Sequence, residues 1–261
     1  MNPEVVKDPN ATVTGKVSGT ISAGNFKDVL KGLETLGDQT IFTFTQSGLT
    51  VGMVDNDVST LVKYELSSSL FEDYKFSSDK FDPIRLGVVV SRIKDITKTL
   101  TTKDILGLEY DSSNPTVLII SAGPIKRSIK LVALKLLREL PAMPETTYEY
   151  NFDIPLKALK DYLRAVAKVQ RDFSFIVNES KKTLTLLTAG DSPVELQLEP
   201  DNWNCTKSSR STYSIEKLSH GLAVGKKTNV TIYGGQDLNI LFKWMQVDGF
   251  NCSCLLAPKL K

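Results

Sequence analysis

A glycine and lysine run near the C-terminal end has the residue types of a phosphate-binding loop. It consists of Gly221, Gly225, Lys226, Lys227 and Thr228. A phosphate loop needs four residues between its glycines and a lysine followed directly by serine or threonine, because its amides must converge on the phosphates. Here three residues separate the glycines, and Lys227 intervenes before Thr228. The spacing therefore disfavours a nucleotide-hydrolysing site.

Two Ser-x-x-Lys pairs have the spacing of a serine nucleophile and its lysine: Ser91 with Lys94, and Ser214 with Lys217. The Lys-Thr-Gly companion of such enzymes is missing, and both serines stand where a helix is expected to begin. We interpret them as helix caps. His220, the single histidine, has no acid partner placed beside it and is a poor general base. No catalytic residues remain, and we expect a protein that is not an enzyme.

The three cysteines, Cys205, Cys252 and Cys254, are too few for a disulfide framework. Cys252 and Cys254 alternate along an expected strand, and we expect their thiols to point to opposite or poorly matched faces. The chain has a single histidine, and the cysteines together with it are a poor set of ligands for a metal ion. The sequence therefore predicts reduced thiols, no metal and no other cofactor.

The 261 residues are 41% hydrophobic and 24% charged, which is typical of a globular protein with a substantial core. No apolar run approaches the roughly 18 residues of a membrane helix, and residues 1–15 lack a signal core. We expect an intracellular protein that has no membrane partner.

Hydrophobic periodicity predicts helices over about 25–36, around 93–100, over 155–171 and over 215–222. Between them, β-branched and alternating runs predict strands at 41–45, 49–54, 60–66, 86–90, 105–110, 117–121, 125–132, 173–178, 183–187, 194–198, 212–214, 229–233, 238–244 and 252–256. Pro141 and Pro144 prevent regular structure between the halves.

The order of elements in the first half repeats in the second. This indicates an α+β fold made of a duplicated domain, each copy with two helices on one face of an antiparallel sheet. We expect an N-terminal tail over 1–15, a first domain over 16–131, a connector over 132–147 and a second domain over 148–261.

Basic residues are concentrated on the expected helices, although 32 bases against 30 acids leave a net charge of only +2. On the third expected helix, Lys160, Arg164, Lys168 and Arg171 stand at i, i+4, i+8 and i+11 and form one basic row, interrupted only by Asp161. A positive surface built from helices suits sequence-independent contact with duplex phosphates. The predicted contacts are Lys27, Lys31, Lys94, Lys98, Lys160, Arg164, Lys168, Arg171 and Lys217.

Two expected strands carry opposite charge. Lys126, Arg127 and Lys130 make residues 125–131 basic, whereas Glu195 and Glu199 make residues 194–199 acidic. If both strands are sheet edges, they can pair between chains in a head-to-tail contact that closes into a ring or runs on as a filament. Charges that merely keep edges apart are an equally good explanation.

The ending Leu255-Leu256-Ala257-Pro258-Lys259 and the run Gly48-Leu49-Thr50-Val51 followed by Asp55 carry a family likeness. With them, residues 16–261 resemble DNA sliding clamps of the proliferating cell nuclear antigen (PCNA) type. The resemblance implies a homotrimeric or heterotrimeric ring whose helices line a hole around duplex DNA. Such a ring acts as a processivity factor that a clamp loader places on DNA and that tethers DNA polymerase and other replication or repair proteins.

The resemblance also implies a pocket for partner peptides between the connector, the loop after residue 54 and the C-terminal residues. By position it comprises Val54, Val58, Leu61, Leu140, Met143, Pro144, Leu255, Ala257 and Pro258. The implied location is the nucleus in a eukaryote, the cytoplasm in an archaeon or the host replication site for a virus. The alternative is a clamp-like scaffold without a ring, such as a checkpoint subunit or viral processivity factor acting as a monomer or in a heterotrimer.

Overall fold

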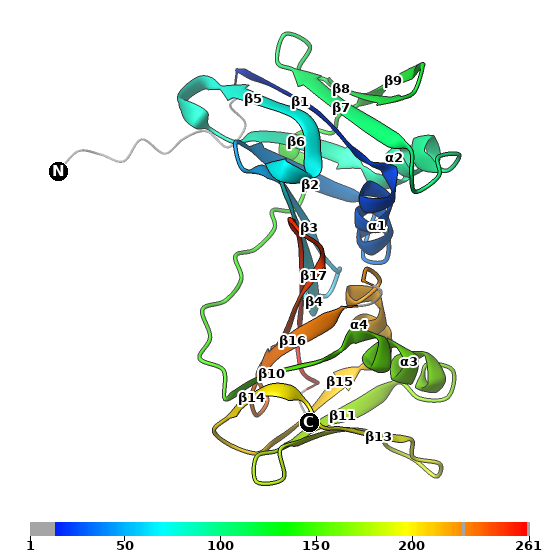
Figure 1. Cartoon of the computed structure of the whole chain (residues 1–261), viewed down its shortest axis with the longest axis vertical. Helices are drawn as coiled ribbons and strands as arrows, with labels where there is room; N and C mark the ends of the chain where they lie inside the picture. Colours follow the sequence, from blue (N-terminus) through cyan, green and yellow to red (C-terminus); the bar gives the residue numbers. More distant parts are fainter. Residues whose placement is uncertain (1–13, 226–227, 260–261) are drawn as a thin grey trace, which may run out of the picture. The chain divides into compact units, whose positions relative to one another are not determined.

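The computed structural model describes residues 14–225 and 228–259 (Figure 1). Most of the expected tail over 1–15, together with Lys226 and Lys227, lies outside the described residues. The first repeat contains β1 (Gly15–Ser22), α1 (Ala23–Glu34), β2 (Gln39–Thr45), β3 (Gly48–Val54), β4 (Thr60–Ser67), β5 (Phe71–Ser78), β6 (Ile84–Val89), α2 (Val90–Thr97), β7 (Ile105–Asp111), β8 (Val117–Ala122) and β9 (Ile125–Lys130).

The second repeat contains β10 (Tyr150–Pro155), α3 (Leu156–Val166), β11 (Asp172–Asn178), β12 (Thr183–Thr188), β13 (Glu195–Leu198), β14 (Asp201–Cys205), β15 (Ser209–Ser214), α4 (Ile215–Gly221), β16 (Asn229–Gly234), β17 (Ile240–Val247) and β18 (Phe250–Leu256). Three short 3-10 helices complete the list: η1 (Ser68–Leu70), η2 (Asp79–Phe81) and η3 (Leu134–Leu136). Helices and strands follow one another in the same order in both repeats.

The described chain divides into two compact units that exchange short segments. Unit 1 comprises the chain up to Leu30, Asp38–Gly52 and Glu65–Leu140. Unit 2 comprises Lys31–Gly37, Met53–Tyr64 and everything from Pro141 onward.

Unit 1 is built from antiparallel strands. One sheet has the order β5-β1-β7-β8-β9, so that β5 and β9 are its edges. β2 pairs with β3 on one side and with β6 on the other. Phe26 and Val29 of α1 and Ile93 of α2 are fully buried, as their helical spacing predicts. Val90, expected at the end of a strand, is instead the first residue of α2 and is also fully buried.

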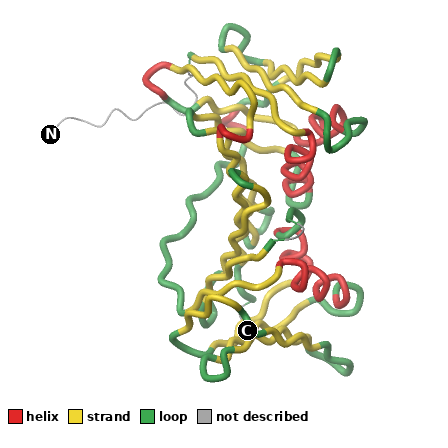
Figure 2. Tube along the Cα trace, viewed as in Figure 1, coloured by secondary structure: helices red, strands yellow, loops and turns green. Residues whose placement is uncertain are grey.

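Unit 2 repeats this pairing scheme. Its sheet β13-β12-β11-β15 corresponds strand for strand to the order β4-β3-β2-β6 in the first repeat. The order β14-β10-β16-β17-β18 corresponds to β5-β1-β7-β8-β9, and β4 follows β18. Figure 2 shows α3 and α4, which Figure 1 labels, beside the strands of unit 2.

Three expectations from the sequence are corrected. The third helix ends at Val166, five residues before the expected Arg171, because residues 167–169 form a turn and the chain enters β11 at Asp172, which pairs with Ser214 of β15. The strands β1, β5, β10 and β14 were not predicted. Polar residues and glycine interrupt the apolar positions of β1, β5 and β14, whereas β10 does alternate, with Tyr150, Phe152 and Ile154 on its buried face, so that its signal was present in the sequence and was missed.

The cysteine prediction also needs correction. Cys252 and Cys254 are two positions apart on β18, and residues with that spacing share a face of a strand. Both are buried on the core face, with 3% and 0% exposure. All three cysteines are free thiols.

Candidate nucleic-acid and protein-binding surfaces

The first two helices carry cations in different states. On α1, Lys31 is exposed, whereas the Lys27 ammonium donates to the carbonyl of Leu100. On α2, Lys98 lies beyond the last helical turn and forms an ion pair with Asp95 at 2.5 Å, while Lys94 is half-buried. Exposed ion pairs exchange readily with solvent and other anions. Lys31 and Lys98 are therefore better placed than Lys27 to meet a phosphate.

On α3, Asp161 is shared by two bases. Lys157 approaches one carboxylate oxygen at 2.6 Å, and Arg164 approaches the other at 2.9 Å. Lys168 and Arg171 follow the end of the helix, so the four-residue basic row of the sequence becomes a shorter helical pair, Lys160 and Arg164, with two cations after it. Their role in binding DNA stays a prediction.

The serines of the two Ser-x-x-Lys pairs both make structural hydrogen bonds at the start of a helix. Ser214 caps α4, since its hydroxyl accepts from the Lys217 amide at 3.4 Å, which agrees with the sequence. The predicted cap at Ser91 is wrong: α2 begins at Val90, and the amide and hydroxyl of Ser91 both donate to the carboxylate of Asp38 (2.7 and 3.0 Å).

Lys217 contacts two acids instead of projecting freely. Its ammonium lies 3.0 Å from Asp55 Oδ2 and also donates to Asp57 and to the Ser59 hydroxyl. Burial alone would raise the pKa of the Asp55 carboxyl, but hydrogen bonds from Thr60, Lys217 and Ser59 hold that pKa well below its ordinary value. The sequence carries no signal for this cluster, because 162 residues separate Lys217 from Asp55.

The implied peptide pocket has members from several segments. Within unit 2, Val58 is 54% exposed, Met143, Leu255, Ala257 and Pro258 are at least partly exposed, and Pro144 is exposed. Leu61 is only 4% exposed and packs in the core, so it offers almost no surface. The Ala257 amide donates to the Ser59 carbonyl at 2.8 Å, which joins the C-terminal residues to the loop that carries Val58. The half-buried Val54 ends β3 before that loop.

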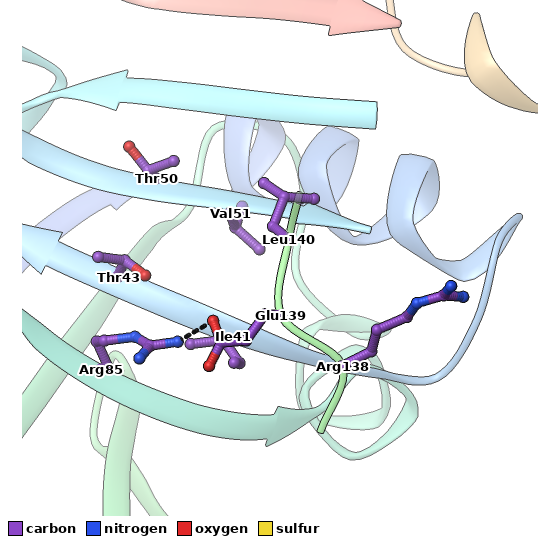
Figure 3. Close-up of a pocket in the computed structure, with 9 residues that line it drawn as sticks. Ile41, Thr43, Thr50, Val51, Arg85, Arg138, Glu139 and Leu140 are labelled. Atoms are coloured by element: carbon purple, nitrogen blue, oxygen red, sulfur yellow. Dashed lines mark hydrogen bonds and ion pairs between the residues drawn. The ribbon is translucent and has the colours of Figure 1, made fainter. Parts of the chain in front are cut away.

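Leu140, the member in unit 1, lines a hollow of about 50 Å³ with Arg138 and Glu139 (Figure 3). The floor is formed by β2 and β3, and Arg85 of β6 forms an ion pair with Glu139. The lining residues are Ile41, Thr43, Thr50, Val51, Gly52, Arg85, Arg138, Glu139 and Leu140.

The two oppositely charged strands are both sheet edges. β9 pairs only with β8, and its Lys126, Arg127 and Lys130 are exposed. β13 pairs only with β12, and Glu195 is exposed, as is Glu199 just beyond the strand. The edge positions that the sequence argument required are thus present.

Neither a metal site nor a membrane span is found within residues 14–225 and 228–259. No group of three or more histidine, cysteine, aspartate or glutamate side chains there could hold a metal ion. No helix in the same ranges is long and apolar enough to cross a membrane.

Two repeats with one order of strands and helices define a duplicated clamp fold. Residues 20–140 match the family model of the proliferating cell nuclear antigen N-terminal domain. The DNA polymerase sliding clamp of Methanocorpusculum labreanum is 25% identical over 250 residues, which cover 94% of this chain and 99% of that protein. These matches confirm the resemblance to sliding clamps of the PCNA type.

Solved structures agree on the fold. The structure of A. fulgidus PCNA bound to the C-terminal region of FEN-1 superposes with a TM-score of 0.85 and 21% identity, covering 94% of this chain and 99% of that one. PCNA from Entamoeba histolytica gives a TM-score of 0.80 at 17% identity, with the same coverage. The duplicated α+β clamp fold expected from the sequence is confirmed.

Proposed function

We propose that this protein is a sliding clamp: a ring of three identical chains that encircles duplex DNA, tethers DNA polymerase and other proteins, and catalyses no reaction. It consists of clamp domains over 16–131 and 148–261, joined by the connector over 132–147. The relatives named DNA polymerase sliding clamp, which align along nearly the whole chain, support this function.

The main support for assembly into a ring is the order of strands in the sheets. In the repeat, β18 is the counterpart of β9, and β4 is the counterpart of β13. β18 and β4 are neighbours in one sheet of this chain, whereas β9 and β13 are free edges. Pairing β9 of one copy with β13 of the next would therefore repeat between chains the contact that β18 and β4 make within one chain. Heterologous contacts of this kind close into rings when the rotation per subunit allows it.

Charge favours the same pairing. Lys126, Arg127 and Lys130 on β9 face solvent and would meet Glu195 and Glu199 of the neighbouring copy. Opposite charges on facing strands fix the partner and its register. A non-ring scaffold acting as a monomer, the alternative function, would leave both edges open to solvent.

Contact with DNA is assigned to exposed cations on or near the helices: Lys31, Lys98, Arg164, Lys168 and Arg171. Phosphate contacts carry no base information, so a ring that holds DNA through them can slide. Clamp-dependent synthesis on a primed circular template tests this assignment. The double variant Arg164→Glu with Lys168→Glu should reduce synthesis and its salt resistance while the oligomer stays intact.

The matched control is Lys181→Glu with Lys182→Glu, in the exposed turn between β11 and β12, which makes the same change of charge. Equal synthesis by both double variants would reject the assignment of the α3 cations to DNA.

Partner binding is assigned to four apolar residues that are at least partly exposed and that the resemblance places in one groove: Val58, Met143, Ala257 and Pro258. Short amphipathic segments dock in such grooves through a few apolar anchors. Val58→Asn tests the groove without disturbing the loop, because asparagine tolerates the left-handed backbone of this position better than valine does. Titration calorimetry with a peptide from the C-terminal region of A. fulgidus FEN-1 should show weaker binding by Val58→Asn and by Met143→Ala. Unchanged affinity in both would remove the groove.

A further inference from the structure

The carboxylate of Asp55 organises the loop between β3 and β4. Asp55 Oδ1 accepts hydrogen bonds from the amides of Ser59 (2.8 Å) and Thr60 (2.9 Å), and Oδ2 accepts one from the Ser59 hydroxyl (2.9 Å). The Val58 amide donates to the Asp55 carbonyl at 3.2 Å. The side chain of Asp55 therefore bonds to Ser59 and Thr60 at the end of the turn, and its backbone carbonyl bonds to Val58.

This turn holds Val58 in a strained conformation. Its φ of 59° lies in the left-handed region, which a β-branched residue rarely adopts. Strained residues persist only where the surrounding structure constrains them, and they concentrate at binding sites. The hydrogen bonds of Asp55 supply the constraint, and the result is an apolar side chain presented to solvent in the proposed groove.

Lys217 supports the turn from the first turn of α4. Its ammonium has three N–H donors, and the three contacts to Asp55, Asp57 and the Ser59 hydroxyl can use all of them. The side chains of Lys217 and Asp55 are 28% and 14% exposed, whereas that of Asp57 is 66% exposed. Lys217 thus points into the turn and has little capacity left for a phosphate.

The C-terminal residues are tied to the same elements. The Ala257 amide donates to the Ser59 carbonyl and the Lys259 amide to the Thr212 carbonyl, both at 2.8 Å. Thr212 lies on β15, which leads through the cap Ser214 into α4. Ser59 is therefore the junction at which the Lys217 cluster meets the segment that carries Ala257 and Pro258.

We propose that Lys217 is a positioning residue for the partner-peptide groove: its ion pairs with Asp55 and Asp57 hold the 55–59 turn and the C-terminal segment in the shape that receives a peptide. This inference rests on the proposed function of the groove. It changes the role that the sequence suggested for Lys217, from a phosphate contact to a support of the protein-binding surface.

The test compares Lys217→Gln with Lys217→Arg and with the control Lys181→Gln. Affinity for the A. fulgidus FEN-1 peptide is measured by titration calorimetry, and the exchange rates of the Ser59 and Thr60 amides are measured by hydrogen exchange in the free protein. Lys217→Gln should weaken binding about fivefold to tenfold. It should also speed exchange of both amides, because the turn loses an ion pair that holds their acceptor. Lys217→Arg, which keeps the charge, should restore most of the affinity, and Lys181→Gln should behave as the wild type.

Wild-type affinity and unchanged amide exchange in Lys217→Gln would overturn the positioning role. The same variant would then be expected to lose clamp-dependent synthesis, as a phosphate contact should. If the wild type itself did not bind the peptide, the groove of the proposed function would be wrong, and the inference would fall with it. The two failures are therefore distinguished by the wild-type titration.

Discussion

The ammonium of Lys160 on α3 donates hydrogen bonds to the carbonyl oxygens of Gly225, at 2.6 Å, and of Val224, at 3.0 Å. Lys160 belongs to the basic row that the sequence assigns to DNA, and Gly225 belongs to the glycine and lysine run that resembles a phosphate loop. The structure brings the two features together, with carbonyl oxygens facing the lysine. At this point the run accepts hydrogen bonds from a cation, which is the opposite of what a phosphate cradle needs.

Removing this contact should cost stability. Lys160→Met keeps most of the aliphatic stem but leaves two carbonyls without the ammonium, and we expect a loss of about 1 kcal/mol in the free energy of unfolding. Lys168→Met, at a cation in the turn after α3, should change it by less than about 0.5 kcal/mol. Urea unfolding of both variants makes the comparison, and equal stability would show that the Lys160 contact is of no energetic importance.

Gly221, at the end of α4, packs against the buried thiol of Cys254. A β-carbon at position 221 would lie 2.2 Å from Cys254 Sγ but 3.5 Å from both Cys254 Cβ and Thr60 Cγ2. Gly221→Ala should therefore destabilise by about 1–3 kcal/mol through overpacking. Because Cys254→Ala removes the sulfur, the double variant should be more stable than the sum of the two single changes predicts. Additive effects in thermal unfolding would contradict this packing account.

Stability should depend on pH through Asp55. The pKa of its carboxyl is lowered in the folded protein, so its contribution is complete above the ordinary aspartate pKa of about 3.9 and is lost as the pH falls toward the lowered value. The stability advantage of the wild type over Asp55→Asn should therefore be constant from pH 7 to pH 5 and shrink below pH 4. Denaturant titrations at several pH values measure it, with Asp191→Asn in an exposed loop as control. An advantage that grows in acid would contradict the direction of the shift.

Charge reversal tests the two edges. Lys126→Glu with Lys130→Glu on β9 should dissociate the ring, because both changes place acids opposite Glu195 and Glu199. Adding Glu195→Lys and Glu199→Lys to the same chain should restore assembly, since the facing charges are again opposite. Sedimentation velocity of the three proteins reports the outcome. Intact assembly of the first variant, or failure of the fourfold variant to reassemble, would move the interface elsewhere.

The fold was largely predictable because its strongest signals are local. Phe26, Val29, Leu30 and Leu33 recur at helical spacing, and all are buried on α1. Strands such as β1 and β5 were not visible, because glycine, serine and charged residues interrupt their apolar positions. These strands are stabilised by pairing with neighbours distant in sequence, and single-sequence periodicity carries no information on such pairing.

The surfaces were predictable in part. The charged edges followed from composition, since the bases of 125–131 and the acids of 194–199 need no tertiary knowledge. The sequence alone does not tell which lysines are available to bind a phosphate, because this depends on the tertiary structure. Lys27, Lys160 and Lys217 each donate hydrogen bonds to acceptors from distant segments. The Ser91 cap failed for the same reason, because Asp38, from the segment before β2, supplies the hydrogen bonds at that helix start.

Light scattering of the purified protein tests the central claim most directly. One chain has a mass of 28.8 kDa, so a closed ring of three copies should give about 86 kDa, independent of concentration over the working range. A mass of one chain, or a mass that rises continuously with concentration, would contradict the ring. The first result would favour a scaffold that acts as a monomer or with different partner chains, and the second an open filament.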